Sequence, residues 1–137
     1  MTTTTIAALQ ERAYRQSAEK GFHDDEPTEG SALLSLNAER IALITSEASE
    51  ALEELRNGKA PNETYYPAKP WFRRFWNWIT RAPKTPAKPE GVPSEMADVV
   101  IRVLDFCGAN NINLEAMILE KLSYNQTRPA RHGGKKF

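Results

Sequence analysis

The segments ITSEASEALEELR (residues 44–56) and PSEMADVVIRVLDFCG (residues 93–108) decide the fold. In the first, apolar residues recur every three or four positions, at Ile44, Ala48, Ala51, Leu52 and Leu55. This spacing fits the helical period, and Asn57-Gly58 is a typical end for such a helix. The β-branched residues of the second segment make a strand conceivable. However, its polar residues recur at three and four positions, at Glu95, Asp98, Arg102 and Asp105, so we predict a helix here too.

One further helix is predicted before this pair and another after it. Residues 5–20 have loosely helical apolar spacing and end at Gly21, and the helix containing residues 44–56 extends back to Ser31, through Leu34 and Ile41. Ser94 is the expected N-cap of the third helix, which runs to Gly108. Asn113 is the expected cap of a fourth over residues 114–125, whose predicted inner face consists of Leu114, Met117, Ile118 and Leu122. The expected fold is an all-α, four-helix core in a single domain, residues 1–137.

Residues 59–93 interrupt this pattern and are predicted to be an insertion rich in proline and tryptophan. Their centre, WFRRFWNWI at residues 71–79, predicts a short helix that is apolar on one side and basic on another. A flap over the site or an oligomer contact is the favoured interpretation. Docking on a membrane surface and stacking on single-stranded nucleic acid are less favoured alternatives, and no stable nucleic-acid partner is expected.

Composition indicates a cytoplasmic protein. The N-terminus lacks the basic flank and long apolar stretch of a signal peptide, and no apolar run reaches the roughly 20 residues that span a bilayer. The single cysteine, Cys107, cannot form an internal disulfide and is expected to be buried. The net charge is zero, but residues 1–56 are predominantly acidic and residues 121–137 contain only basic charges. An acidic half and a basic tail together suggest a metal-bound phosphate ligand.

Acidic pairs in the two central helices predict a cation site. Glu47 and Glu50 are spaced i,i+3 beside the apolar stripe, and Glu95 and Asp98 repeat this spacing. Four facing carboxylates would repel one another unless a cation lay between them, and magnesium favours such oxygen ligands. Simpler alternatives are a solvated acidic face and, for Glu95 and Asp98, a favourable position at a helix N-terminus.

These motifs resemble those of the MazG-like all-α nucleoside triphosphate pyrophosphohydrolases, whose signature is an ExxE helix followed by an ExxD helix. Here they read Glu47-Ala-Ser-Glu50 and Glu95-Met-Ala-Asp98. The segment KLSYNQTRPARHGGKKF resembles the family's C-terminal segment, and KGF at residues 20–22 resembles the end of its first helix. Many members have another Glu where this chain has Ser46, which leaves the number of metal ions open.

The resemblance implies hydrolysis of a nucleoside or deoxynucleoside triphosphate to the monophosphate and pyrophosphate. It also implies a homodimer or homotetramer and a Mg²⁺ cofactor that Mn²⁺ can replace, held by Glu47, Glu50, Glu95 and Asp98. Either Glu53 or Glu54 would accept a proton from the attacking water. A nucleotide diphosphate or another pyrophosphate-linked compound is an alternative substrate.

Basic and polar residues of the C-terminal segment are the predicted substrate ligands. Lys121, Asn125 and Arg128 share one helical face while the helix persists, and the two cations would neutralise phosphate charge and assist catalysis. Tyr124 and Arg131 belong to the same predicted substrate-binding set. A solvated Lys121 and a capping Arg128 are the structural alternative.

His23 is a candidate for lining the base pocket, although a solvent-exposed turn histidine is the favoured alternative. The sequence lacks a P-loop, a CxxC pair and a reactive Cys/His arrangement, which disfavours Walker-type, zinc and covalent chemistry. The competing function is a non-catalytic helical module that docks on a membrane or a protein through residues 71–79.

Overall fold

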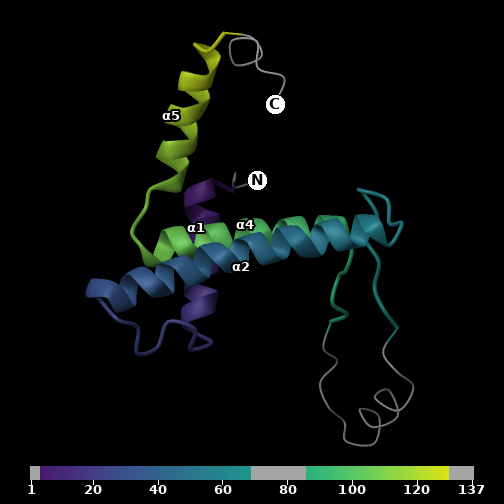
Figure 1. The fold of residues 1–137 in the computed structure, drawn as a ribbon, viewed down its shortest axis with the longest axis horizontal. Helices are drawn as coiled ribbons and strands as arrows, with labels where there is room; N and C mark the ends of the chain where they lie inside the picture. The colour runs from purple at the N-terminus through teal and green to yellow at the C-terminus, as the bar shows by residue number, and fades with distance from the viewer. Residues whose placement is uncertain (1–3, 69–85, 130–137) are drawn as a thin grey trace, which may run out of the picture. The chain divides into compact units, whose positions relative to one another are not determined.

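The computed structural model describes residues 4–68 and 86–129, which form four α-helices. These are α1 (Ile6–Ala18), α2 (Gly30–Arg56), α4 (Val92–Ala109) and α5 (Leu114–Gln126) (Figure 1). In the described ranges, Tyr65 and Glu90 form an isolated antiparallel β-bridge outside these helices. The all-α prediction is confirmed for this part of the chain, whereas the predicted helix at residues 71–79 lies outside the described residues.

Side-chain caps fix the starts of the two shorter helices. The Thr5 hydroxyl accepts a hydrogen bond from the Ala8 amide (3.1 Å), and the Asn113 side chain accepts one from the Ala116 amide (3.0 Å). Each bond satisfies an amide that has no partner within the helix. The predicted cap at Asn113 is therefore confirmed.

The predicted cap of α4 is wrong. The helix begins at Val92, so Ser94 lies within its first turn, where its hydroxyl donates to the Pro89 carbonyl (2.9 Å). Pro93 fits the first turn because amides there have no helical partner. Gly91, with a φ of +102°, directs the chain into the helix.

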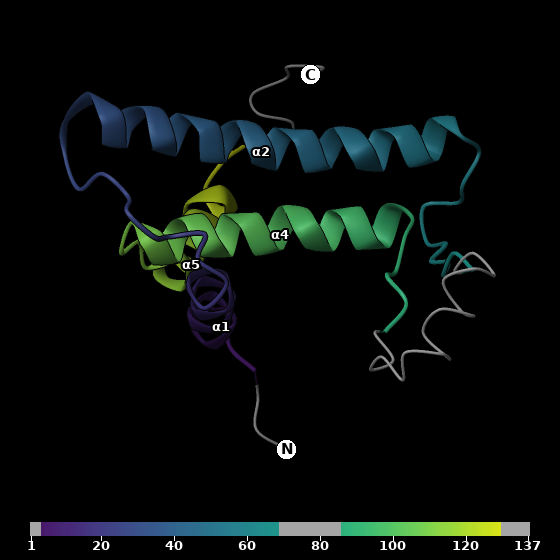
Figure 2. The same cartoon turned by 90° about the horizontal axis from the view of Figure 1, so that it is seen from below.

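The chain forms two compact units. The terminal unit comprises Met1–Arg40 and Ile101–Phe137, and the central unit comprises Ile41–Val100, so α2 and α4 each contribute to both. In the terminal unit α1 contacts α5, and the Gln10 side-chain amide donates to the Ile112 carbonyl (2.8 Å). In the central unit the last part of α2 and the first part of α4 run side by side in opposite directions (Figures 1 and 2).

Among the residues that the structure describes, few apolar side chains are buried within one chain. The described core consists of Ala51, Val92, Leu104 and Cys107, which confirms the prediction for Cys107. The stripe predicted on α2 is largely exposed: Leu34 is 72% exposed and Leu52 is 54% exposed. On α5, Met117 and Leu122 are exposed too, so the burial predicted for these faces is not found within one chain.

Among the described residues, no helix combines the length and the apolar character needed to cross a membrane.

Candidate metal centre

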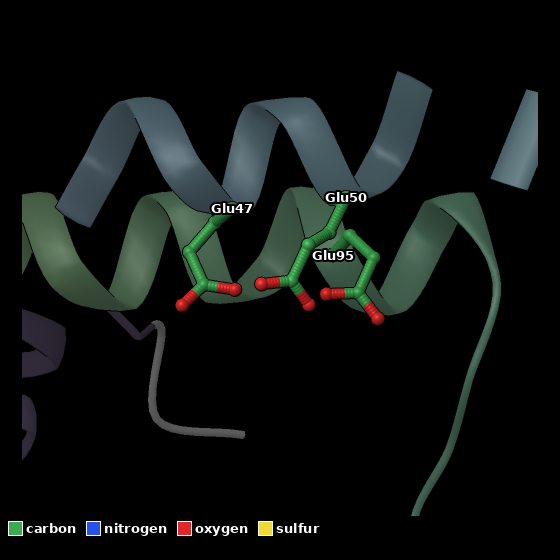
Figure 3. A group of neighbouring side chains, drawn as sticks. All are labelled: Glu47, Glu50 and Glu95. Atoms are coloured by element: carbon green, nitrogen blue, oxygen red, sulfur yellow. The ribbon is translucent and has the colours of Figure 1, made fainter. Parts of the chain in front are cut away.

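Two helices of the central unit contribute acidic side chains to one place. Glu47 and Glu50 are one helical turn apart on α2, beside the buried Ala51, and Glu95 is in the first turn of α4. Their carboxyl groups lie in a row along the two helices (Figure 3). One carboxylate oxygen from each residue can be chosen so that all three lie within 4.8 Å of one another.

The cluster combines buried and exposed ligands. Glu95 is 4% exposed and Glu47 is 8% exposed, whereas Glu50 is open to solvent. Carboxylate oxygens are the ligands that hard divalent cations prefer, and Glu50 gives the cluster a side that is exposed to solvent. The cluster therefore has the donor chemistry of a magnesium or manganese site.

Burial and neighbouring charges control the ionisation of Glu95. Burial raises the pKa of this carboxyl group, Lys88 lowers it, and the negative charges of Glu50, Asp98 and Glu90 raise it. The balance raises the pKa of Glu95, so its ionised form is less favoured than that of a glutamate in water. A bound cation would favour the ionised form because it lies against the charge.

Asp98, the fourth predicted ligand, is near the cluster but does not complete it. It is half-buried one turn beyond Glu95 on α4, and its charge contributes to the raised pKa of Glu95. It does not belong to the group of mutually close ligand atoms in the described residues. Its side chain is one methylene shorter than that of glutamate and starts a full turn further along the axis. Its role as a metal ligand stays a prediction.

The two candidate general bases on α2 have different surroundings. The Glu53 side chain is 59% exposed, and its carboxylate pairs with Arg56 at 2.8 Å. Glu54 is half-buried, and its carboxylate accepts a hydrogen bond from the Tyr65 hydroxyl, with O–O distances of 3.2 and 3.3 Å to the two carboxylate oxygens. Tyr65 was not predicted as a site residue because the contact crosses the loop after α2, and no local pattern indicates it.

The predicted phosphate-binding residues belong to the terminal unit. Lys121, Tyr124 and Asn125 are on α5 and Arg128 follows it, all exposed to solvent. The Lys121 ammonium lies 5.5 Å from the centre of the Tyr124 ring. Arg131 lies outside the described residues. That these phosphate-binding residues lie close to the acidic cluster stays a prediction.

The side chain of His23 is largely shielded from solvent, so the exposed-turn alternative is wrong. Its side chain is 8% exposed, with Nδ1 at 2.8 Å from Glu26 and Nε2 at 2.9 Å from Asp105. Arg40 contacts both Nδ1 of His23, at 2.7 Å, and the Glu26 carboxylate. Because both ring nitrogens have protein partners, the geometry favours a structural role over recognition of a base. A polar cluster drawn from three segments has no local sequence signal.

Comparison of the chain with models of protein families, with curated proteins and with solved structures found no match.

Proposed function

We propose that this protein is a magnesium-dependent pyrophosphohydrolase with a MazG-like all-α core, which hydrolyses a nucleoside or deoxynucleoside triphosphate to the monophosphate and pyrophosphate. The observation that carries the proposal is the convergence of Glu47, Glu50 and Glu95 within 4.8 Å. These three residues come from the two motifs, ExxE and ExxD, that the sequence shares with that family. Helical spacing alone places the acids on each helix, and their convergence joins the two motifs into one candidate site.

The donor set fits a hard divalent cation. All three groups are carboxylates, and no cysteine or histidine belongs to the cluster within the described residues, which favours magnesium or manganese over zinc. Glu47, Glu50 and Glu95 would hold the ion, with Asp98 as the proposed fourth ligand. Bound there, the ion would polarise phosphate oxygens and stabilise the charge that develops on them.

The chain's own side chains would supply the remaining chemistry. A glutamate of α2, either Glu53 or Glu54, would take the proton of the attacking water. Lys121 and Arg128 would neutralise phosphate charge, and Asn125 would bind a phosphate or sugar oxygen. Tyr124 and Arg131 complete the proposed substrate-binding set.

We propose that two or four chains assemble to complete the fold. Many large apolar side chains of the described residues are exposed, among them Leu34, Ile41, Leu52, Met96, Val100, Met117 and Leu122. Extensive exposed apolar surface is typical of chains that bury it against a partner. A partner chain can also bring cationic residues to the acidic cluster, and the proposed location of the assembly is the cytoplasm.

Incubation with a panel of nucleoside and deoxynucleoside triphosphates tests this function. With Mg²⁺, the purified chain should release pyrophosphate and a monophosphate, with greatly reduced release in EDTA. Glu50→Gln should reduce the rate by about 100-fold or more, since it removes a metal ligand. If only binding to membranes or proteins is found and no triphosphate is cleaved, the chain is the non-catalytic module. Cleavage of a diphosphate alone would reassign the substrate.

A further inference from the structure

The described residues of the loop between α2 and α4 place a tyrosine against one of the two candidate bases. The Tyr65 hydroxyl lies 3.2 and 3.3 Å from the two oxygens of the Glu54 carboxylate. Burial and the negative charge of Glu54 raise the pKa of Tyr65. The hydroxyl therefore keeps its proton near neutral pH and acts as the hydrogen-bond donor.

Several contacts hold Tyr65 in this position. Its amide donates to the Glu90 carbonyl (3.1 Å), and the Glu90 amide donates to the Tyr65 carbonyl (2.9 Å). The Lys59 ammonium lies 4.3 Å from the centre of the Tyr65 ring and pairs with Glu63 at 2.9 Å. Both backbone and ring are thus restrained, so the hydroxyl is a preorganised donor.

Glu54 lies one helical turn beyond Glu50, whereas Glu53 lies about 100° away from Glu54 around α2. Glu53 pairs with Arg56, and both side chains are largely exposed to solvent. Glu54 alone of the two candidates has a half-buried carboxylate with a restrained donor.

We infer that Glu54 is the general base and that Tyr65 is a positioning residue, which holds the Glu54 carboxylate in the orientation that accepts the water's proton. This inference rests on the proposed function and narrows it. It also gives the loop after α2 a part in the reaction, because the Tyr65–Glu90 bridge connects this loop to the start of α4.

Hydrolysis of the bridge between the α and β phosphates needs no reactant other than water. Water oxygen bonds to one phosphorus of the α–β bridge, and the bond from that phosphorus to the bridging oxygen breaks. The leaving group, pyrophosphate after attack on the α phosphorus or the monophosphate after attack on the β phosphorus, keeps the bridging oxygen and the electron pair of the broken bond. Glu54 accepts the proton of the water, and Tyr65 keeps its own proton and its hydrogen bond throughout. Tyr65 does not touch the reacting atoms.

Tyr65→Phe tests this role because it removes the hydroxyl and keeps the ring. We expect kcat to fall about tenfold, from the loss of orientation, with KM nearly unchanged. The Mg²⁺-dependent rise in Tm should equal that of the wild type, since no proposed ligand is altered. The matched control is Tyr66→Phe at the neighbouring tyrosine, which is 63% exposed and should keep full activity.

A double-mutant cycle separates positioning from a general effect on folding. Glu54→Gln should lower kcat more than Tyr65→Phe, and Tyr65→Phe should have no further effect in the Glu54→Gln background, because its effect acts through Glu54. An unchanged kcat in Tyr65→Phe, additive effects, or a larger loss in Glu53→Gln than in Glu54→Gln would overturn the inference and leave the proposed function intact. A wild type that cleaves no triphosphate would overturn both.

Discussion

Glu95 shows at the level of one residue how the candidate site conflicts with the stability of the chain. Its side chain is almost completely buried, and burial together with neighbouring acids keeps its pKa above the usual range despite Lys88. At neutral pH the ionised carboxylate costs free energy that a neutral side chain of the same shape would not cost. Functional sites commonly accept such a cost.

We predict that Glu95→Gln makes the metal-free chain more stable. The amide keeps the shape and removes the charge, so the free energy of unfolding in EDTA should increase by about 0.5–2 kcal/mol. The same variant should lose most of the Tm increase that Mg²⁺ produces in the wild type. Thermal unfolding with and without Mg²⁺ measures both the stability of the metal-free chain and the rise in Tm that Mg²⁺ produces. Glu120→Gln, on the exposed surface of α5, is the matched control and should change neither. A less stable, fully Mg²⁺-responsive Glu95→Gln variant would contradict the assignment.

The raised pKa of Glu95 also fixes the sign of a pH effect. Between its usual pKa and the raised value, the folded chain binds more protons at this group than the unfolded chain. The Glu95 contribution to stability should therefore fall as pH rises through this window, and the loss should be complete above the folded pKa. Urea unfolding in EDTA at several pH values should show this slope in the wild type. The difference between wild type and Glu95→Gln isolates it, and an opposite sign in that difference would contradict the account.

At the scale of elements, the start of α4 depends on a close contact at Gly91. A Cβ atom there would lie 2.4 Å from the Glu63 carbonyl oxygen, and its φ of +102° disfavours other residues. Gly91→Ala should lower the free energy of unfolding by about 2–4 kcal/mol. Gly58→Ala is the control, because Gly58 also has a positive φ but no atom within 4 Å of the added Cβ. Chemical denaturation should show the smaller loss for Gly58→Ala. Equal losses would mean that the contact with Glu63 is unimportant.

The cluster around His23 joins three segments of the terminal unit. His23 follows α1, Arg40 is on α2 and Asp105 is on α4, and the His23 ring also lies 4.8 Å from the Tyr14 ring of α1. His23→Ala should destabilise the chain by about 2–4 kcal/mol, since it leaves partly buried charges without their partner. Arg15→Ala, which breaks an exposed pair with Glu19, should cost less than about 1 kcal/mol. If His23→Ala lowered the free energy of unfolding by less than Arg15→Ala does, a structural role for His23 would be contradicted.

The elements that follow from local rules could be predicted, and those that depend on distant contacts could not. Periodicity gave the helices, and Asn113 is a cap because its side chain reaches an amide three residues away. Ser94 was assigned wrongly because Gly91 and the contact with Glu63 let α4 start earlier. For the site, i,i+3 spacing placed acids on each helix, but only the tertiary structure brings Glu95 to Glu47 and leaves Asp98 outside the group. The contacts of Tyr65 and His23 had no local signal.

At the scale of the whole molecule, the exposed apolar faces predict an assembly. The periodic stripes on α2 and α5 were expected to fill a core, yet large side chains such as Leu34, Leu52 and Leu122 are more than half exposed. Light scattering coupled to size-exclusion chromatography should give the mass of two or four chains. Replacement of Leu34 by Glu should shift this mass toward the single chain, because a charge cannot be buried cheaply in an apolar interface. A monomer at micromolar concentration would contradict the proposed assembly.

The proposed metal-dependent hydrolysis is tested by product analysis of the triphosphate panel with the wild type and with the double variant Glu50→Gln plus Asp98→Asn. If the acidic cluster is a catalytic metal centre, the wild type should form pyrophosphate and monophosphate in equal amounts with Mg²⁺, and the double variant should react more slowly by about 100-fold or more. If the wild type cleaves no triphosphate and the double variant binds nucleotide and Mg²⁺ as the wild type does, the acidic cluster is not a catalytic metal centre.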